Sequence, residues 1–193
     1  ILDGGNFDWG KAGADRQPAL NTPDPCYGGV VWDEQVTKNM GLPFAYLLKL
    51  RTTLLRDLGG AMSPFNAWMF IQGLETLPLR MREHANNAQQ VAEFLASNKK
   101  VQSVTYPGLF EGAEKEKADK YMTGGYGALI GFELPGGKEA GSKFIDSLEL
   151  LYHVANIGDS RSLAIHPATT THSQLAPEEQ LSAGVTPGYV RLS

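Results

Sequence analysis

Tyr152-His-Val-Ala-Asn-Ile-Gly-Asp-Ser-Arg-Ser-Leu-Ala-Ile-His-Pro-Ala-Thr-Thr-Thr-His172 decides the fold, together with Thr186-Pro-Gly-Tyr-Val-Arg-Leu-Ser193. Two apolar runs, 151–157 and 162–165, predict strands, and the Gly-Asp pair between them predicts a turn. A third short strand is predicted over 189–192. Polar side chains gather where these strands end, so this part of the chain is the first place to look for a site.

Arg191 lies inside the third apolar run. Strand alternation places it on one face with Tyr189, and it places Val190 and Leu192 on the face that we expect to meet the core. An arginine in such a run must either reach water along its aliphatic stem or bind an anion. Arg191 is therefore a candidate anion-binding residue, and a buried structural ion pair is the alternative.

The rest of the chain predicts an α/β fold. Further strands are expected over 101–106 and 128–134, and helices over 43–58, 64–73, 76–97, 114–122, 138–148 and 177–183. From residue 101 onward, strands and helices alternate as in helices packed over one sheet. Residues 1–40 show poor periodicity, so we expect a long surface segment with three docked aromatic residues, Trp9, Tyr27 and Trp32.

Composition limits the classes of function. The 193 residues carry a net charge of −4 and no dense basic patch, which argues against nucleic acid as a partner. No apolar run approaches the roughly 20 residues of a membrane helix, so no membrane partner is expected. The single cysteine, Cys26, excludes an intramolecular disulfide and fits a reducing, cytoplasmic location.

Three other kinds of site find little support in the sequence. The four histidines lack the spacing of a metal site, and His84 is better explained as a core or edge residue of its helix than as a ligand. A hydrolase triad of Ser162, His166 and Asp159 would lack the Gly-x-Ser-x-Gly elbow. No Gly-x-Gly-x-x-Gly motif or Walker loop occurs, so a nucleotide site is not expected.

Three motifs that follow one another in order carry a resemblance to a known family. They are Asn156-Ile-Gly-Asp159, His166-Pro-Ala-Thr-Thr-Thr-His172 and Gly188-Tyr-Val-Arg-Leu-Ser193. The segment Asp24-Pro-Cys-Tyr27 and the helical run from Ser63 to Leu95 add to them. In these residues the chain resembles the Cys/Met-metabolism family of pyridoxal-phosphate enzymes, and within that family it is most similar to the O-acetylhomoserine sulfhydrylases.

The resemblance implies the C-terminal portion of a fold-type I enzyme, similar to aspartate aminotransferase. Residues 1–62 would be the tail of the large cofactor-binding domain, and residues 63–193 the linking helices and the small C-terminal α/β domain. The family's Schiff-base lysine lies in a Ser-x-Thr-Lys motif, which occurs nowhere in this sequence and would precede Ile1. We therefore expect a piece of a longer homotetrameric enzyme, with no catalytic residue in this piece.

The resemblance also implies roles for three residues. Arg191 would bind the α-carboxylate of a small amino-acid substrate, because its planar guanidinium can donate two parallel hydrogen bonds. Asn156 would contact the same carboxylate, or would serve only as a turn residue. Ala155 stands where some cystathionine enzymes have glutamate, so we expect a preference for substrates without a distal ammonium, or else an ordinary strand residue.

The implied activity is a γ-replacement that uses pyridoxal phosphate as cofactor. It would convert O-acetylhomoserine and sulfide, or a thiol, into homocysteine or methionine. The alternatives within the family are a cystathionine γ-synthase or lyase, an O-succinylhomoserine sulfhydrylase and a methionine γ-lyase. An alternative of another class is a non-catalytic piece that serves only folding or assembly.

Overall fold

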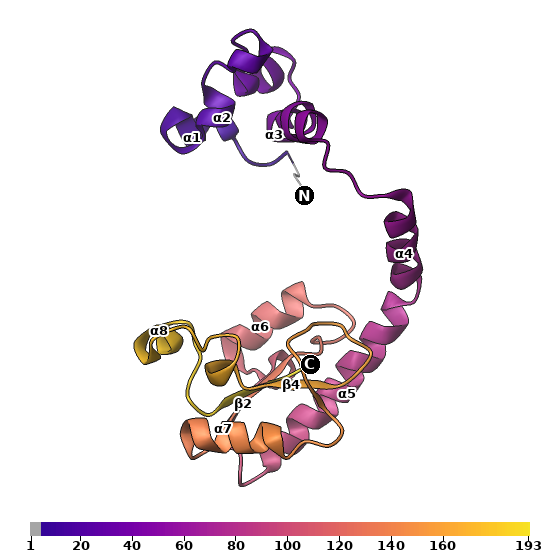
Figure 1. Ribbon diagram of the computed structural model, residues 1–193, viewed down its shortest axis with the longest axis vertical. Coiled ribbons are helices and arrows are strands. Elements are labelled where there is room, and N and C mark those ends of the chain that lie inside the picture. The colour runs from indigo at the N-terminus through magenta and orange to yellow at the C-terminus, as the bar shows by residue number, and fades with distance from the viewer. Residues whose placement is uncertain (1–4) are drawn as a thin grey trace. The chain divides into compact units, whose positions relative to one another are not determined.

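The computed structural model describes residues 5–193, and the chain divides into two compact units (Figure 1). The first unit runs to Met69, and the second runs from Phe70 to Ser193. The division falls inside helix α4 (Pro64–Glu75). Residues 1–4, where the predicted surface segment begins, lie outside the described residues. The assignment of residues 1–62 to a large cofactor-binding domain stays a prediction.

The first unit is helical, so the expectation of an irregular segment up to residue 40 was wrong. Its elements before residue 41 are α1 (Trp9–Arg16), α2 (Pro18–Asn21), η1 (Pro25–Tyr27) and η2 (Asp33–Asn39). Two aspartates cap these helices: Asp8 accepts from the N–H of Lys11 at 3.1 Å, and Asp24 accepts from the N–H of Cys26 at 2.9 Å. The helices are too short to display an apolar period, which is why periodicity missed them.

A small core holds the first unit together, and the predicted docking of its aromatic residues is confirmed. The core residues are Leu20, Trp32, Val36 and Ala45. The indole of Trp32 is 5% exposed and donates to Asp24 Oδ2 at 2.8 Å. Trp9 stacks on Tyr46 with ring centroids 5.0 Å apart. These aromatic residues therefore serve packing within the unit.

The helix expected over 43–58 forms, but its second half is wound more widely than an α-helix. Helix α3 (Ala45–Lys49) continues directly into the π-helix η3 (Leu50–Leu58). Gly59 follows with a φ of 69° and ends the helix where the sequence predicts its end. The hydroxyl of Thr53 donates at 2.6 Å to a carbonyl four residues earlier, so it competes with a helical N–H for that acceptor.

Helices α4 and α5 (Leu77–Ser97) form where the sequence predicts them. Ser63 caps α4, because its Oγ accepts from the N–H of Asn66 at 3.1 Å. On α5, Val91 is 39% exposed and Ala92 is fully buried. The buried residues of α5 are Ala85, Ala88, Ala92 and Leu95. Small alanine side chains let this helix lie close to the sheet.

The second unit is built on a five-stranded sheet in the order β1-β2-β5-β4-β3, which confirms the predicted α/β fold. Strands β3 and β4 are parallel, and the other neighbours are antiparallel. The strands are β1 (Ser103–Thr105), β2 (Ile130–Glu133), β3 (Tyr152–His153), β4 (Leu163–Ile165) and β5 (Tyr189–Leu192). The other elements after α5 are η4 (Pro107–Leu109), α6 (Gly112–Tyr121), α7 (Gly137–Asp146), η5 (Pro167–Thr169) and α8 (Pro177–Ser182).

One face of the sheet carries the main core, against α5 and α7 (Figure 1). Phe132 and Val190 pair across β2 and β5 and are almost fully buried. Leu192 packs against the same cluster. The alternation predicted for β5 is thus confirmed, and it leaves Tyr189 and Arg191 on the opposite face.

Strand β3 is much shorter than the predicted strand over 151–157. Only Tyr152 and His153 pair with β4, and the chain then enters an exposed loop. In that loop the side chain of Asn156 accepts from the N–H of Ile157 at 2.9 Å. The N–H of Val154, the first after β3, donates to the carbonyl of Tyr152 at 3.0 Å, so the main chain leaves the ladder there.

Candidate functional site

Arg191 sits near the middle of the sheet, on the face opposite the main core. It pairs with Gly131 of β2 on one side and with Ile165 of β4 on the other. Glycine at position 131 leaves room for the ring of Tyr189, since a Cβ there would lie 2.6 Å from the Tyr189 Cζ. Burial raises the pKa of the Tyr189 hydroxyl, while the positive charge of Arg191 opposes that shift. The phenol of Tyr189 is therefore partly removed from water and lies within reach of the charge of Arg191.

The guanidinium of Arg191 has an unused donor. Its Nη2 donates to the main-chain carbonyl of Asn156 at 3.2 Å, and its Nε is buried without a hydrogen-bond partner. Within residues 5–193, no carboxylate forms an ion pair with it. A buried N–H without an acceptor is rare in proteins unless a ligand or water accepts from it. Arg191 can therefore bind an anion through this N–H.

Asn156 meets Arg191 with its main chain and not with its side chain. The side-chain Oδ1 accepts from the N–H of Ile157, and Nδ2 donates to Asp159 Oδ2 at 3.3 Å. The side chain thus lies within its own turn, and its contact with a substrate carboxylate stays a prediction. The sequence offers no signal for the contact of its carbonyl with Arg191, which joins residues far apart in the chain.

Asp159 organises this turn. It accepts hydrogen bonds from the Nε and Nη2 of Arg161 at 3.1 and 2.9 Å and from the N–H of Arg161 at 3.0 Å. These bonds, led by the one from the Arg161 side chain, hold the pKa of the Asp159 carboxyl well below its usual range. The carboxylate is therefore ionised at neutral pH and fixes the shape of the loop.

Ala155 lies in the exposed part of the same loop, one residue before Asn156. Its position next to the residue whose carbonyl meets Arg191 places it beside the candidate anion site. A small uncharged side chain there leaves space for a ligand. Its role in specificity stays a prediction.

His166 is a structural residue, which excludes the hydrolase triad considered from the sequence. Its side chain is fully buried, with Nδ1 2.9 Å from Thr169 Oγ1 and Nε2 2.8 Å from the carbonyl of Pro187. Both ring nitrogens are thus engaged, and Asp159 is occupied by Arg161. His166 therefore cannot act as a general base for Ser162.

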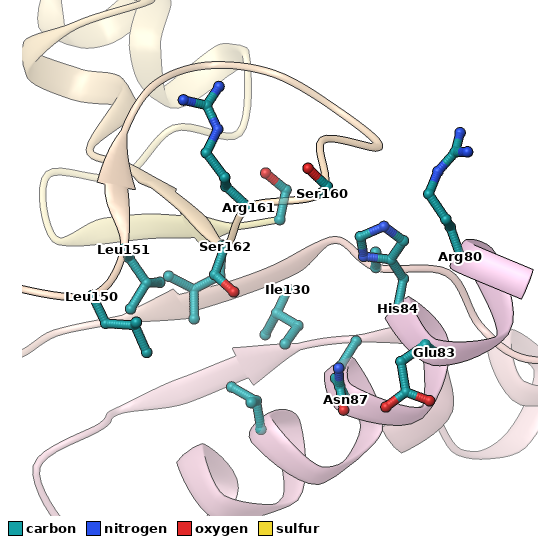
Figure 2. A pocket seen from close by; sticks show the side chains of 15 residues that line it. Arg80, Glu83, His84, Asn87, Ile130, Leu150, Leu151, Ser160, Arg161 and Ser162 are labelled. Carbon is teal, nitrogen blue, oxygen red and sulfur yellow. The ribbon is translucent and has the colours of Figure 1, made fainter. Parts of the chain in front are cut away.

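A cavity of about 440 Å³ opens beside the loop that holds Asp159 (Figure 2), with Arg161 and Ser193 among the residues that line it. His84 lines it, together with Arg80 and Asn87 of α5 and with apolar side chains that include Ile130 and Leu192. Arg161 contacts Asp159 and Ser193 contacts the carbonyl of Asn156, so this cavity adjoins the turn that meets Arg191. His84 is half-buried and faces this cavity from α5.

The residues around Arg191 fit a substrate carboxylate and do not fit the anchoring of a carbonyl cofactor. The groups that contact Arg191 and its turn come from Asn156, Asp159, Arg161 and Ser193, and none of them is a lysine. Elsewhere, Lys49 is tied to Asp24 and Lys115 to Asp119. A lysine that binds a carbonyl group needs a free amine, so neither residue suits that role.

Comparison with known proteins decides the family. The model of the family described as Cys/Met metabolism PLP-dependent enzyme matches residues 26–193. The chain belongs to this family. The matched residues include the three motifs found in the sequence, so the resemblance drawn from them is confirmed, and pyridoxal phosphate is the cofactor of the family.

Relatives place this member of the Cys/Met-metabolism family near the sulfhydrylases. The chain is 52% identical to an O-acetyl-L-homoserine sulfhydrylase of Leptospira meyeri and 43% identical to a homocysteine synthase of Schizosaccharomyces pombe. Each alignment covers all of this chain and 44% of the relative. The chain therefore spans less than half the length of these curated relatives.

A solved structure confirms the fold. The chain superposes on the crystal structure of an O-acetylhomoserine (thiol)-lyase of Campylobacter jejuni with a TM-score of 0.77 and 41% sequence identity. The match covers 93% of this chain and 41% of that protein, which carries N'-pyridoxyl-lysine-5'-monophosphate. Within the described part of our chain, no helix has the length and apolarity needed to cross a membrane.

Proposed function

We propose that the full-length protein containing this chain is an O-acetylhomoserine sulfhydrylase, a transferase that makes homocysteine or methionine from O-acetylhomoserine and sulfide or a thiol. The names of the relatives support this activity. The buried, unpartnered Nε of Arg191 is the observation that supports a role for this chain in that reaction. When bound, pyridoxal phosphate supplies an electron sink for the bond changes at the substrate.

Arg191 is the residue that holds the substrate in this proposal. A guanidinium binds a carboxylate best through two parallel charge-assisted hydrogen bonds, and Nε and one Nη form such a pair. Nη2 carries two N–H groups and donates one to the carbonyl of Asn156, so its other N–H and the unpartnered Nε–H are the pair left for the α-carboxylate. Asn156 belongs to the substrate site chiefly through this carbonyl.

Ala155 supports the choice of branch. A substrate whose distal end is an acetyl ester has no positive charge to satisfy, and alanine offers none. A glutamate at this position would instead attract a distal ammonium, as in cystathionine. The small exposed side chain of Ala155 thus favours O-acetylhomoserine over cystathionine.

We also place the enzyme in the cytoplasm as a homotetramer. The single cysteine is consistent with a reducing compartment. Helix α4 exposes large apolar side chains, including Phe65 at 64% and Phe70 at 62%, and exposed apolar patches mark association surfaces. Light scattering of the full-length protein measures the number of subunits directly.

Steady-state assays of the full-length protein test the proposed activity. With pyridoxal phosphate and sulfide, kcat/KM for homocysteine formation should be higher from O-acetylhomoserine than from O-succinylhomoserine. The opposite ranking would make it an O-succinylhomoserine sulfhydrylase. If neither ester yields homocysteine while cystathionine is turned over, the proposed reaction is wrong.

A further inference from the structure

Four donors converge on the carboxylate of Asp159 in an otherwise exposed loop. Three come from Arg161, as its N–H, Nε and Nη2, and the fourth is the Nδ2 of Asn156 at 3.3 Å. Gly158, with a φ of 77°, closes the turn next to it. The side chain of Asp159 is only 13% exposed. One carboxylate therefore sets the shape of the whole turn.

This turn presents a single main-chain group to β5, the carbonyl of Asn156. The carbonyl accepts from Arg191 Nη2 at 3.2 Å and from Ser193 Oγ at 3.1 Å. Both donors come from the end of β5, more than thirty residues later in the chain. The position of the carbonyl thus fixes one end of the guanidinium plane.

The orientation of that plane decides whether Arg191 can bind a carboxylate with two bonds. A long arginine side chain has many rotamers. Binding of a carboxylate to a mobile guanidinium is weakened by the conformational entropy that the side chain loses when it is ordered. A fixed acceptor at Nη2 removes part of this freedom before the ligand arrives. The buried Nε of Arg191 then stays aimed at one place.

We propose that Asp159 is a positioning residue that aims Arg191 at the substrate carboxylate, by holding Arg161 and the carbonyl of Asn156 in place. The inference rests on the proposed function, because it requires Arg191 to bind a carboxylate. Asp159 itself touches neither substrate nor cofactor in this account. Its effect reaches the site only through the turn.

A double-mutant cycle on the full-length holoenzyme tests the proposal. Asp159→Asn keeps the size of the side chain and removes its charge, so we expect KM for O-acetylhomoserine to rise about tenfold with kcat within about twofold. In the Arg191→Ala background the same change should alter KM by less than about twofold, because the aimed group is gone. Asp159→Glu should recover part of the lost affinity.

The matched control is Asp119→Asn. Asp119 is also an ion-paired carboxylate of the second unit, with Lys115 as its partner, and hydrogen bonds likewise lower its pKa. Asp119 has no contact with the turn, so we expect the KM of the Asp119→Asn enzyme for O-acetylhomoserine to stay within about twofold of the parent value. If Asp159→Asn does not fold, Arg161→Gln replaces it in the same cycle, with a smaller rise in KM that also vanishes without Arg191.

The outcomes separate the inference from the proposed function. If Asp159→Asn raises KM equally with and without Arg191, or behaves like Asp119→Asn, the turn does not aim Arg191 and the inference is wrong. The same holds if Arg161→Gln shows no coupling to Arg191. If Arg191→Ala itself changes kcat/KM by less than about tenfold, Arg191 does not bind the substrate carboxylate. The inference is then wrong as well, because it depends on that role.

Discussion

The carboxylate of Glu133 on β2 accepts a hydrogen bond from the N–H of Gly188 at 3.1 Å, where β5 begins. The hydroxyl of Thr186 donates to its other oxygen. A Cβ at position 188 would lie 2.8 Å from Glu133 Oε1, so glycine is what lets the carboxylate reach the turn. One side chain of β2 thus fixes the start of the strand that carries Arg191.

Replacing Glu133 should therefore destabilise the second unit. Glu133→Ala leaves the two donors of the turn without their acceptor, and we expect the free energy of unfolding to fall by about 2 kcal/mol. Glu139→Ala, an exposed glutamate of α7, is the control and should cost less than about 0.5 kcal/mol. Denaturant unfolding of the three chains gives both values, and equal effects of the two changes would contradict this role of Glu133.

The free energy of unfolding should fall at acid pH because of Asp24. A hydrogen bond from Lys49, followed by one from Trp32, lowers the pKa of Asp24 from 3.8 to about 2. Since the folded pKa is depressed, the stabilisation is present above about pH 4 and is lost as the pH falls towards 2. Lys49→Met should weaken that dependence. A carboxyl-carbon NMR titration checks the cause, and a midpoint near 3.8 for Asp24 in the parent chain would refute it.

Ala155→Glu should shift the choice of substrate. In the full-length enzyme, the added carboxylate offers a partner to a distal ammonium, so turnover of cystathionine should rise relative to that of O-acetylhomoserine. Ala155→Gln adds similar bulk without the charge and is the control. The measurement is the ratio of the two kcat/KM values. An unchanged ratio in the glutamate variant would remove Ala155 from the account of specificity.

A polypeptide of only these 193 residues should not bind pyridoxal phosphate covalently. The Ser-x-Thr-Lys motif is not in the sequence, and Lys49 and Lys115 are held by carboxylates. Incubation with pyridoxal phosphate should give no specific visible absorbance, and borohydride should leave no stoichiometric adduct in the mass spectrum. One fully labelled lysine would show that this stretch carries its own cofactor anchor.

Local patterns predicted the parts of this fold that depend on neighbours in sequence. The alternation around Val190 and Arg191 predicted the correct faces of β5, and the helix expected from residue 64 begins there as α4. Both depend on a few adjacent residues. The motifs around Asn156, His166 and Arg191 were enough to identify the family, because their order and spacing are specific.

Contacts between distant residues could not be predicted in the same way. Nothing near Asn156 in sequence indicates that its carbonyl meets Arg191, and nothing near Glu133 indicates that it caps the start of β5. The strand predicted over 151–157 failed for a related reason. Its apolar residues fit a strand, but the N–H of Val154 donates to the carbonyl of Tyr152, and the chain leaves the ladder after His153.

The most direct test of the central claim is the kcat/KM of the Arg191→Ala variant of the full-length enzyme with O-acetylhomoserine. Loss of the carboxylate contact should cost about 3–5 kcal/mol, a fall of at least about a hundredfold, and Arg191→Lys should recover only part because it lacks the fork. Circular dichroism confirms that both variants fold. A folded Arg191→Ala enzyme within about tenfold of the parent would contradict the assignment of Arg191 as the carboxylate anchor.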